Sequence, residues 1–355
     1  MVGFFKKNFY LIVFGAVLLG KSEFVLAEIQ SGNIEIDSLV HILKSEKSDK
    51  SKIVLYNKIS WIFLEYDFNS GINYADSALK LSQKINWEFG VAEAYNNFAL
   101  AYRYKGEIST SIEYHNKALD ILISNSEKEK IAETYGYLGI AYYNISSFPQ
   151  AFNYFDKSLK IYRELNDEKG IAKCLSYIGI LHTSFGDYTK ALDYFIRALN
   201  IEKKLNNKKN IAIQLGNIAT TYYELKDYKN ALIYFNKTLK ELEEIKDSYN
   251  YSTFLFNAGR VYAEIKNYDK AREIFLKSLS YAENTGDKYL TAYVTGEQGN
   301  LSLKIINDSL IKYEINTKNK LIKEAIEKLK YSADLFAELG IEDERKNYLL
   351  LLSKA

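Results

Sequence analysis

"GDYTKALDYFIRALNIEKKLNN", residues 186–207, is followed forty residues later by a near copy of itself, "KDYKNALIYFNKTLKELEEIKD", residues 226–247. In the first copy Ala191, Phe195 and Leu199 are spaced four residues apart, so they share one face of a helix. Turn-forming residues flank both copies. The stretch therefore predicts an amphipathic helix that the chain uses more than once.

The same helix can be followed along most of the chain in steps of forty residues. A small residue comes first, a residue that is usually aromatic follows at the fourth position, and leucine at the eighth. The three columns are Gly71, Ser111, Ala151, Ala191, Ala231 and Ala271; Ala75, His115, Phe155, Phe195, Phe235 and Phe275; and Leu79, Leu119, Leu159, Leu199, Leu239 and Leu279. No insertion interrupts them, which is typical of a repeat architecture.

The half of each unit that precedes this helix repeats as well. Its columns are Ala99, Gly139, Gly179, Ala219, Gly259 and Gly299, and three residues later Tyr102, Tyr142, His182, Tyr222 and Tyr262. Each unit is therefore expected to be a pair of helices, in which small residues let the two axes approach and large rings fill the space beside the contact.

Short turns join the two helices of a unit. Gly106 and Gly186 are suited to a left-handed residue at the end of the first helix. Asp187, Asp227 and Asn267 follow such turns, and each is expected to cap the second helix through its side-chain oxygen.

This pattern of small residue, tyrosine, turn, small residue, aromatic residue and leucine resembles the tetratricopeptide repeat from about Lys50 to Leu339. The forty-residue unit is similar to the subgroup typified by kinesin light chains and bacterial Rap-type regulators, and to exported arrays that form the sensory halves of bacterial signalling proteins. The resemblance implies an all-α, right-handed superhelical solenoid of stacked antiparallel helix pairs, whose first helices line a concave groove. One unit cannot bury its own apolar face, so neighbouring units must stack.

About seven repeats are expected in residues 50–339, between a capping helix in 28–49 (Ile36–Ser45) and a second capping helix in 340–355. In the seventh repeat the small residue expected at position 311 appears as Ala325, which indicates a fourteen-residue insertion near 306–319. Longer helices or an extended loop would explain it. The alternative is a special binding element.

The first 27 residues have the order of a secretory signal peptide. Lys6 and Lys7 precede an apolar run at 9–19, and Ala27 offers a small residue for cleavage. We therefore expect a periplasmic or secreted protein with no stable membrane span after cleavage, with an uncleaved anchor or a cytosolic protein as alternatives. The only cysteine is Cys174, so neither a lipid anchor at the cut nor an internal disulfide is expected.

Composition and motifs argue against several classes of function. Cleavage would remove three lysines and one glutamate and bring the formal net charge from +2 to zero, so no field favours nucleic acid. No zinc-protease, CxxC or Gly-rich phosphate motif is present. His115 and His182 stand in packing columns, and Cys174 is interpreted as a buried structural thiol. We expect no enzyme activity, no metal and no cofactor.

The groove implied by the resemblance would be lined by residues two before, one after and five after the small residue of each first helix. The candidates for a peptide-binding groove are Asn97, Leu100, Tyr137, Ile140, Tyr177, Ile180, Asn217, Thr220, Asn257 and Arg260. In related repeats asparagine at the first of these positions often hydrogen-bonds a ligand's backbone; here the residue types could also reflect composition alone. Arg260 is the only basic residue among them, so a carboxylate clamp is not expected.

The sequence thus predicts an exported, non-enzymatic scaffold that binds a peptide or protein in its groove. The alternative is a sensory or regulatory module of a bacterial signal-transduction system, either stand-alone or followed beyond Ala355 by a membrane helix and output domain. A structural part of an envelope assembly is a third possibility. The composition, rich in Lys, Asn, Ile and Tyr, is typical of an AT-rich bacterial genome.

Overall fold

The computed structural model describes residues 26–64, 67–308 and 314–355, with side chains from residue 35 onward. All regular structure in these ranges is α-helical, in sixteen helices, which confirms the expected all-α class. The predicted signal peptide lies outside the described residues except for Leu26 and Ala27. No helix in the described part has the length and apolar character needed to span a bilayer.

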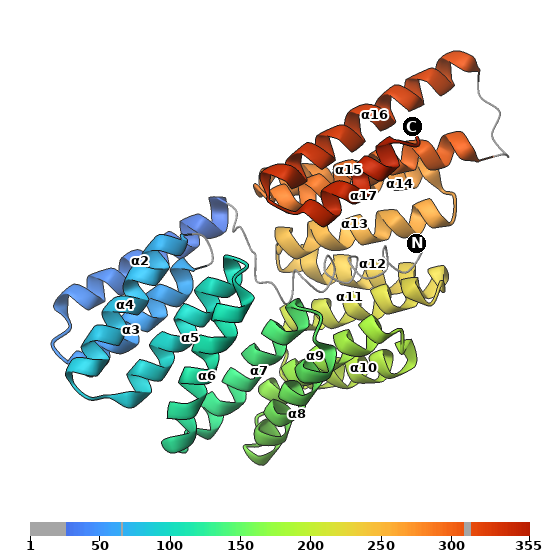
Figure 1. Ribbon diagram of the computed structural model, residues 1–355. Coiled ribbons are helices and arrows are strands. Elements are labelled where there is room, and N and C mark those ends of the chain that lie inside the picture. The colour runs from blue at the N-terminus through green and yellow to red at the C-terminus, as the bar shows by residue number, and fades with distance from the viewer. Residues whose placement is uncertain (1–25, 65–66, 309–313) are drawn as a thin grey trace. The chain divides into compact units, whose positions relative to one another are not determined.

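The described residues divide into two compact units, 26–206 and 207–355. Each unit is a stack of antiparallel helices in which consecutive helices pack against each other (Figure 1). The helices of the first unit are α2 (Leu26–Ser45), α3 (Asp49–Phe63), α4 (Phe68–Lys84), α5 (Glu88–Tyr104), α6 (Ile108–Ser124), α7 (Lys128–Asn144), α8 (Phe148–Glu164), α9 (Glu168–Phe185) and α10 (Tyr188–Lys204). Those of the second are α11 (Lys208–Glu224), α12 (Tyr228–Glu244), α13 (Ser248–Glu264), α14 (Tyr268–Asn284), α15 (Lys288–Asn307), α16 (Ile315–Glu338) and α17 (Glu342–Leu352).

The forty-residue period is two helices and two turns. A residue with positive φ ends one helix every twenty residues, and Gly106 (φ 84°) and Gly186 (φ 78°) are two of these, as expected. The side chains of Asp187, Asp227 and Asn267 accept hydrogen bonds from backbone N–H groups three residues later, at 3.4, 3.1 and 3.3 Å. The predicted caps are therefore confirmed, and they set the start of α10, α12 and α14.

In several helix pairs a large ring on the second helix packs against a small residue on the first. Phe155 on α8 and Phe195 on α10 are fully buried, and they lie against Gly139 on α7 and Gly179 on α9. A Cβ atom on Gly139 would come within 2.5 Å of the Phe155 ring. The small residues at these first-helix positions therefore act as predicted, because they allow the close approach that the rings then fill.

The seventh pair contains the insertion. Its helices α15 and α16 have 20 and 24 residues, whereas most others have 17. Leu329 and the carbonyl of Ala325 pack against Gly299, so Ala325 takes the place of the expected small residue. Much of the insertion is thus added helix length. At the end of α15, the Asp308 carboxylate accepts hydrogen bonds from Lys266 (3.1 Å) and Tyr268 (2.7 Å).

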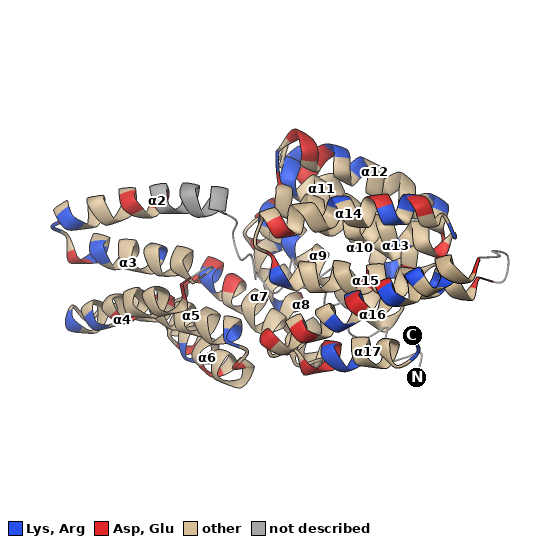
Figure 2. Cartoon of the chain, turned by 90° about the horizontal axis from the view of Figure 1, so that it is seen from above, with Lys and Arg blue, Asp and Glu red and all other residues tan. Residues whose placement is uncertain are grey.

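Acidic and basic side chains are interspersed along the helices of both units (Figure 2). Many form pairs three or four residues apart on one helix, such as Lys117 with Glu113 and Lys160 with Asp156. Such exposed pairs contribute little to stability. They agree with the expectation of a solvated surface without a strong field of one sign.

Candidate functional site

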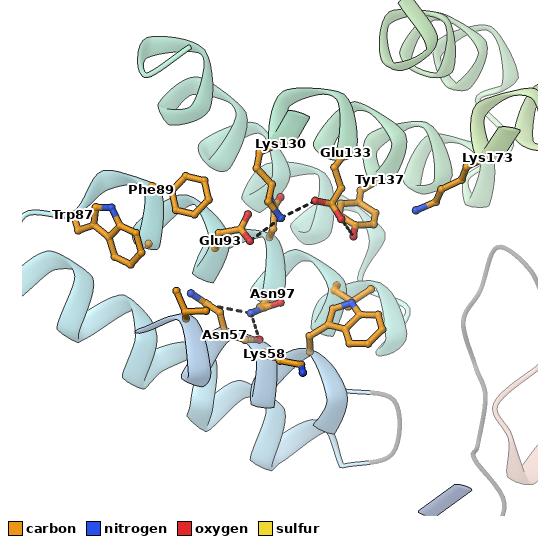
Figure 3. A pocket seen from close by; sticks show the side chains of 15 residues that line it. Asn57, Lys58, Trp87, Phe89, Glu93, Asn97, Lys130, Glu133, Tyr137 and Lys173 are labelled. Carbon is orange, nitrogen blue, oxygen red and sulfur yellow. Dashed lines mark hydrogen bonds and ion pairs between the residues drawn. The ribbon is translucent and has the colours of Figure 1, made fainter. Parts of the chain in front are cut away.

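A pocket of about 540 Å³ lies in the first unit, on the first helices of consecutive pairs (Figure 3). It is formed by α3, the start and middle of α5, α7 and one residue of α9. Its lining residues are Val54, Asn57, Lys58, Trp61, Trp87, Phe89, Gly90, Glu93, Asn96, Asn97, Leu100, Lys130, Glu133, Tyr137 and Lys173. The volume suits a few amino-acid side chains or a small organic group.

Helical spacing explains why these residues converge. On α3, residues 54, 57 or 58 and 61 share one face, and on α5 residues 93, 96 or 97 and 100 do so. Since the first helices of neighbouring pairs contact each other (α3 with α5), their equivalent faces join into one surface. The repeat therefore places residues forty positions apart side by side.

Aromatic side chains line the pocket at several points, and they include both tryptophans of the chain, Trp61 and Trp87. Trp61 is 48% exposed and Val54, two turns earlier on α3, is 54% exposed. Trp87 is half-buried, with Phe89 5.6 Å from it and the Lys50 ammonium 5.5 Å from its ring centre. A tryptophan left this exposed offers a large apolar surface to a ligand.

A charged network also lines the pocket. The Lys130 ammonium lies 3.1 Å from a carboxylate oxygen of Glu93 and 2.9 Å from one of Glu133, and the Tyr137 hydroxyl donates to Glu133 at 2.8 Å. Burial raises the pKa of Glu93, and Lys130 offsets only part of this effect. Burial also acts to raise the pKa of Glu133. There, however, the attraction of the Lys130 ammonium outweighs burial, so the pKa of Glu133 is lowered. Although burial lowers the pKa of Lys130, the two carboxylates outweigh it and raise that pKa.

Amide side chains form the floor. The Asn97 amide donates to the backbone carbonyl and the side-chain oxygen of Asn57, at 3.0 and 3.1 Å, across the two neighbouring first helices. Asn96 donates to Thr134 at 3.1 Å and pairs with His115 at 2.8 Å. These bonds hold the amides in fixed orientations.

His115 lies behind this floor and is fully enclosed. Its ring stacks on Tyr137 with 5.4 Å between ring centres. Burial, and then the nearby Arg103, lower the pKa of His115 to about 3. A histidine that stays neutral at physiological pH and is hydrogen-bonded in place is a packing residue, as its column suggested.

Three of the predicted groove residues line this pocket: Asn97, Leu100 and Tyr137. Ile140, Tyr177 and Ile180 belong to the same unit but are buried and lie outside the pocket lining. The Tyr177 ring is stacked on Phe155, 4.9 Å between centres.

The remaining four predicted residues belong to the second unit. Asn217 (0% exposed) and Asn257 (3%) are buried, and neither amide has a hydrogen-bond partner among the described residues. Thr220 donates to the carbonyl of Gly216 at 3.0 Å. The Arg260 guanidinium lies over the Tyr223 ring, 4.9 Å from its centre.

Several pocket residues escaped the sequence prediction. Glu93, Glu133 and Lys173 form a column at forty-residue steps, one helical turn before the positions chosen for the groove. That column could have indicated the site from the sequence, as could the occurrence of both tryptophans within thirty residues of each other. What the sequence could not supply was how far along the first helices the pocket extends.

A second pocket, of about 640 Å³, lies in the second unit beside α14, α15 and α16. Its two basic residues are paired: Lys266 lies 3.1 Å from Asp308, and Arg272 lies 2.7 Å from Glu324. Elsewhere in the described ranges, no three His, Cys, Asp or Glu side chains are grouped to hold a metal ion. Cys174 is buried and contacts the Ser158 hydroxyl at 3.2 Å.

Two family models described as tetratricopeptide repeat match residues 92–121, 130–204 and 210–284, about half of the chain. No curated protein sequence matches the chain significantly.

Three solved structures illustrate the shared fold. A Rap protein complexed with competence and sporulation factor is 18% identical, covers 92% of this chain and 97% of its own, and has a TM-score of 0.55. The apo quorum sensor NprR from B. thuringiensis is 16% identical, with 98% and 97% covered and a TM-score of 0.57. Aspartyl phosphate phosphatase F from Bacillus subtilis is 16% identical, with 91% and 93% covered and a TM-score of 0.55. At these identities the likeness shows the fold alone.

Proposed function

The chain belongs to the tetratricopeptide-repeat family. We propose that it is a non-enzymatic scaffold that binds a peptide or protein on its first helices and, from the signal-like order of its first 27 residues, that it is exported. The family and its structural neighbours support a protein-interaction scaffold or a regulatory sensor. Binding of a peptide is the finer part of the proposal. It is supported by the neighbour whose structure holds a Rap protein with competence and sporulation factor.

The pocket around Trp61 is the observation that carries this proposal. It joins an exposed tryptophan to fixed amides and a charged network, a combination that suits a ligand with both apolar and polar groups. The Asn97 amide points into this surface while bonded to Asn57, so it has an orientation before any ligand arrives. Preorganised groups lose little entropy on binding.

Selection from a random peptide library tests the binding site. The full chain and its Trp61→Ala variant would be used in parallel, and the enriched peptides would be synthesised for calorimetry. We expect peptides that bind the unchanged chain and bind the variant at least about tenfold more weakly, since exposed aromatic anchors dominate such interfaces. Because Trp61 is exposed, circular dichroism of the two proteins should be the same. Peptides bound equally by both would show that this pocket is not the site.

Export needs its own test. The proposed signal segment predicts that the protein, when expressed in its host with an affinity tag at its C-terminus, is recovered from the periplasm or medium with Glu28 as its first residue. N-terminal sequencing and intact-mass measurement would establish this. Recovery in the cytosol with residues 1–27 present would remove export from the proposal and leave peptide binding unaffected.

A further inference from the structure

The last described helix, α17, stands in the repeat where a first helix belongs. It begins at Glu342, and α15 begins at Lys288; the interval is one forty-residue period plus the fourteen-residue insertion. Gly340 and Gly286 precede the two helices at equivalent positions, and both have a φ of 70°. α17 is therefore the first helix of an eighth pair, and the described residues hold no second helix for that pair.

The first described helix, α2, has the opposite place in the repeat. Leu39 stands forty residues before Leu79, so α2 is in the register of a second helix. Its buried residues Ile36 and Leu39 share a core with Ile59 and Ile62 of the following helix, α3. The described residues hold no first helix for the pair of α2. The two end helices are thus the two halves of a helix pair.

Side chains that complete pairs bury are exposed on both end helices. Leu349 on α17 is 41% exposed. At the same position of three complete pairs the leucine is at most 8% exposed: Leu175, Leu215 and Leu255. Ile42 on α2 is 45% exposed, although Leu122 and Leu242 at its position are fully buried. Each end helix therefore lacks the cover that the other half of a pair provides.

Ser38 on α2 matches a hydrogen bond that recurs within complete pairs. Three serines at its position donate to a carbonyl of their own first helix at 2.7 or 2.8 Å: Ser158 to Ala132, Ser278 to Ser252 and Ser332 to Ala292. Ser38 itself is exposed. The carbonyl at the equivalent position of α17 is that of Lys346.

Opposite charges stand where the two end helices would meet. In two complete pairs the first residue of the first helix forms an ion pair with the last residue of the second helix: Lys128 with Glu164 at 3.0 Å, and Lys208 with Glu244 at 3.5 Å. Glu342 on α17 and the exposed Lys44 on α2 occupy these positions with the signs exchanged. An exposed ion pair adds little affinity, but it favours one register of the two helices over others.

We propose that α2 of a second copy of this chain covers α17 and completes the eighth helix pair. The two helices lie antiparallel, so that Leu349 and Ile42 lose exposure and Lys44 lies beside Glu342. The Ser38 hydroxyl donates to the Lys346 carbonyl. Because the contact joins two different surfaces, each copy keeps one end free for the next, and copies associate head to tail.

A second copy is the occupant because, among the described helices, α2 alone has the register of a second helix without a first helix of its own. The inference goes beyond peptide binding and is independent of it. Neither Leu349 nor Ile42 lines the pocket around Trp61, so the two properties can fail separately.

Sedimentation velocity of the full chain, recovered as its host processes it, tests the association from about 1 μM to about 1 mM. We expect the mean mass to exceed that of a monomer and to rise with concentration. Leu349→Glu and Ile42→Glu should each weaken association at least about tenfold. Leu276→Glu is the matched control, because Leu276 is 53% exposed on α14, and it should leave association unchanged. Circular dichroism should be the same for all three variants.

Mixing the two end variants tests whether the contact is head to tail. Leu349→Glu leaves α2 intact, and Ile42→Glu leaves α17 intact. Their equimolar mixture should therefore form dimers and nothing larger, although each variant alone stays monomeric.

Exchange of the charges tests the register. Lys44→Glu and Glu342→Lys should each weaken association about threefold or more, and the two changes in one chain should restore it. Failure of the double variant to recover would overturn the predicted alignment of α2 with α17.

Three results would overturn the interface itself. The unchanged chain, or the mixture of the two end variants, would stay monomeric up to about 1 mM. Alternatively, Leu349→Glu would abolish association and Ile42→Glu would not, which would mean that α17 packs on another α17. Equal weakening by Leu276→Glu would reduce the effect to the added charge.

Discussion

The ring of Phe155 lies against the backbone of Gly139 so closely that a Cβ atom on that glycine would come within 2.5 Å of the ring. The same relation joins Phe195 to Gly179 and Phe275 to Gly259, each at 2.7 Å. This contact, which recurs in the pairs α7–α8, α9–α10 and α13–α14, limits how far the two helices of those pairs can vary in distance. It also explains why small residues form a column that no larger side chain interrupts.

Gly139→Ala should therefore destabilise the protein although alanine favours helix. Overpacking typically costs about 1–3 kcal/mol, more than the ~1 kcal/mol that alanine gains over glycine in a helix. Gly136→Ala, one turn earlier on α7, is the matched control, because the nearest atom to its Cβ would be 3.8 Å away. It should be neutral or stabilising. Urea unfolding gives the free energy of unfolding of both variants. Equal changes in that free energy would show that the Phe155 ring does not limit the size of the side chain at position 139.

The buried His115 predicts a pH dependence of stability. Its folded-state pKa of about 3 lies below the ordinary value of 6.5, so between these values the unfolded chain binds a proton that the folded chain does not. Its contribution to stability is thus lost as the pH falls from 6.5 toward 3, by up to about 1.4 kcal/mol per pH unit.

The variant His115→Gln keeps a polar group for Asn96 but does not titrate. Between pH 7 and pH 5 its free energy of unfolding should fall by on the order of 2 kcal/mol less than that of the unchanged chain. Urea titrations at the two pH values measure this difference. The same loss in both proteins would mean that His115 is protonated in the fold.

Removal of Lys130 should leave the repulsion between the Glu93 and Glu133 carboxylates without the cation that now lies between them. Lys130→Met leaves the carboxylates of Glu93 and Glu133 without their shared cation, at a cost of about 1–3 kcal/mol at neutral pH. Without Lys130, the folded-state pKa of these carboxylates should lie above their unfolded-state pKa. The variant should therefore lose stability as the pH rises through the folded-state pKa, and it should regain part of that stability in acid. Lys128→Met, which removes an exposed pair with Glu164, should have little effect at either pH. A deficit in Lys130→Met that is independent of pH would contradict this account.

The asparagines at equivalent positions should respond oppositely to the same substitution. Asn97→Leu removes hydrogen bonds to Asn57, whereas Asn217→Leu removes a buried amide that has no partner among the described residues. We expect a loss of about 1–2 kcal/mol for the first, and no change or a gain for the second. Thermal unfolding measures both. A clear loss of stability in Asn217→Leu would show that its amide is satisfied, for example by an ordered water.

The forty-residue columns were sufficient to predict the helix pairs, the left-handed turns at Gly106 and Gly186, the caps at Asp187, Asp227 and Asn267, and the place of Ala325 in the interrupted pair. These are local properties, since a face of a helix and a turn depend on residues within a few positions of each other. The groove positions implied by the family resemblance included Asn97, Leu100 and Tyr137, three residues of the pocket.

Which first-helix residues are open to a ligand was decided by the tertiary structure. Asn97 and Asn217 occupy the same position in the repeat, yet one lines the pocket bonded to Asn57 and the other is fully buried. Trp61 and Lys173 come from helices more than a hundred residues apart, and their pairing in one pocket depends on how α3, α5, α7 and α9 stack. The sequence by itself determined the repeating helix pair, because burial of one apolar face is encoded by spacing alone. Exposure and charge balance in the pocket depend on neighbours from several repeats at once, which only the packed structure brings together.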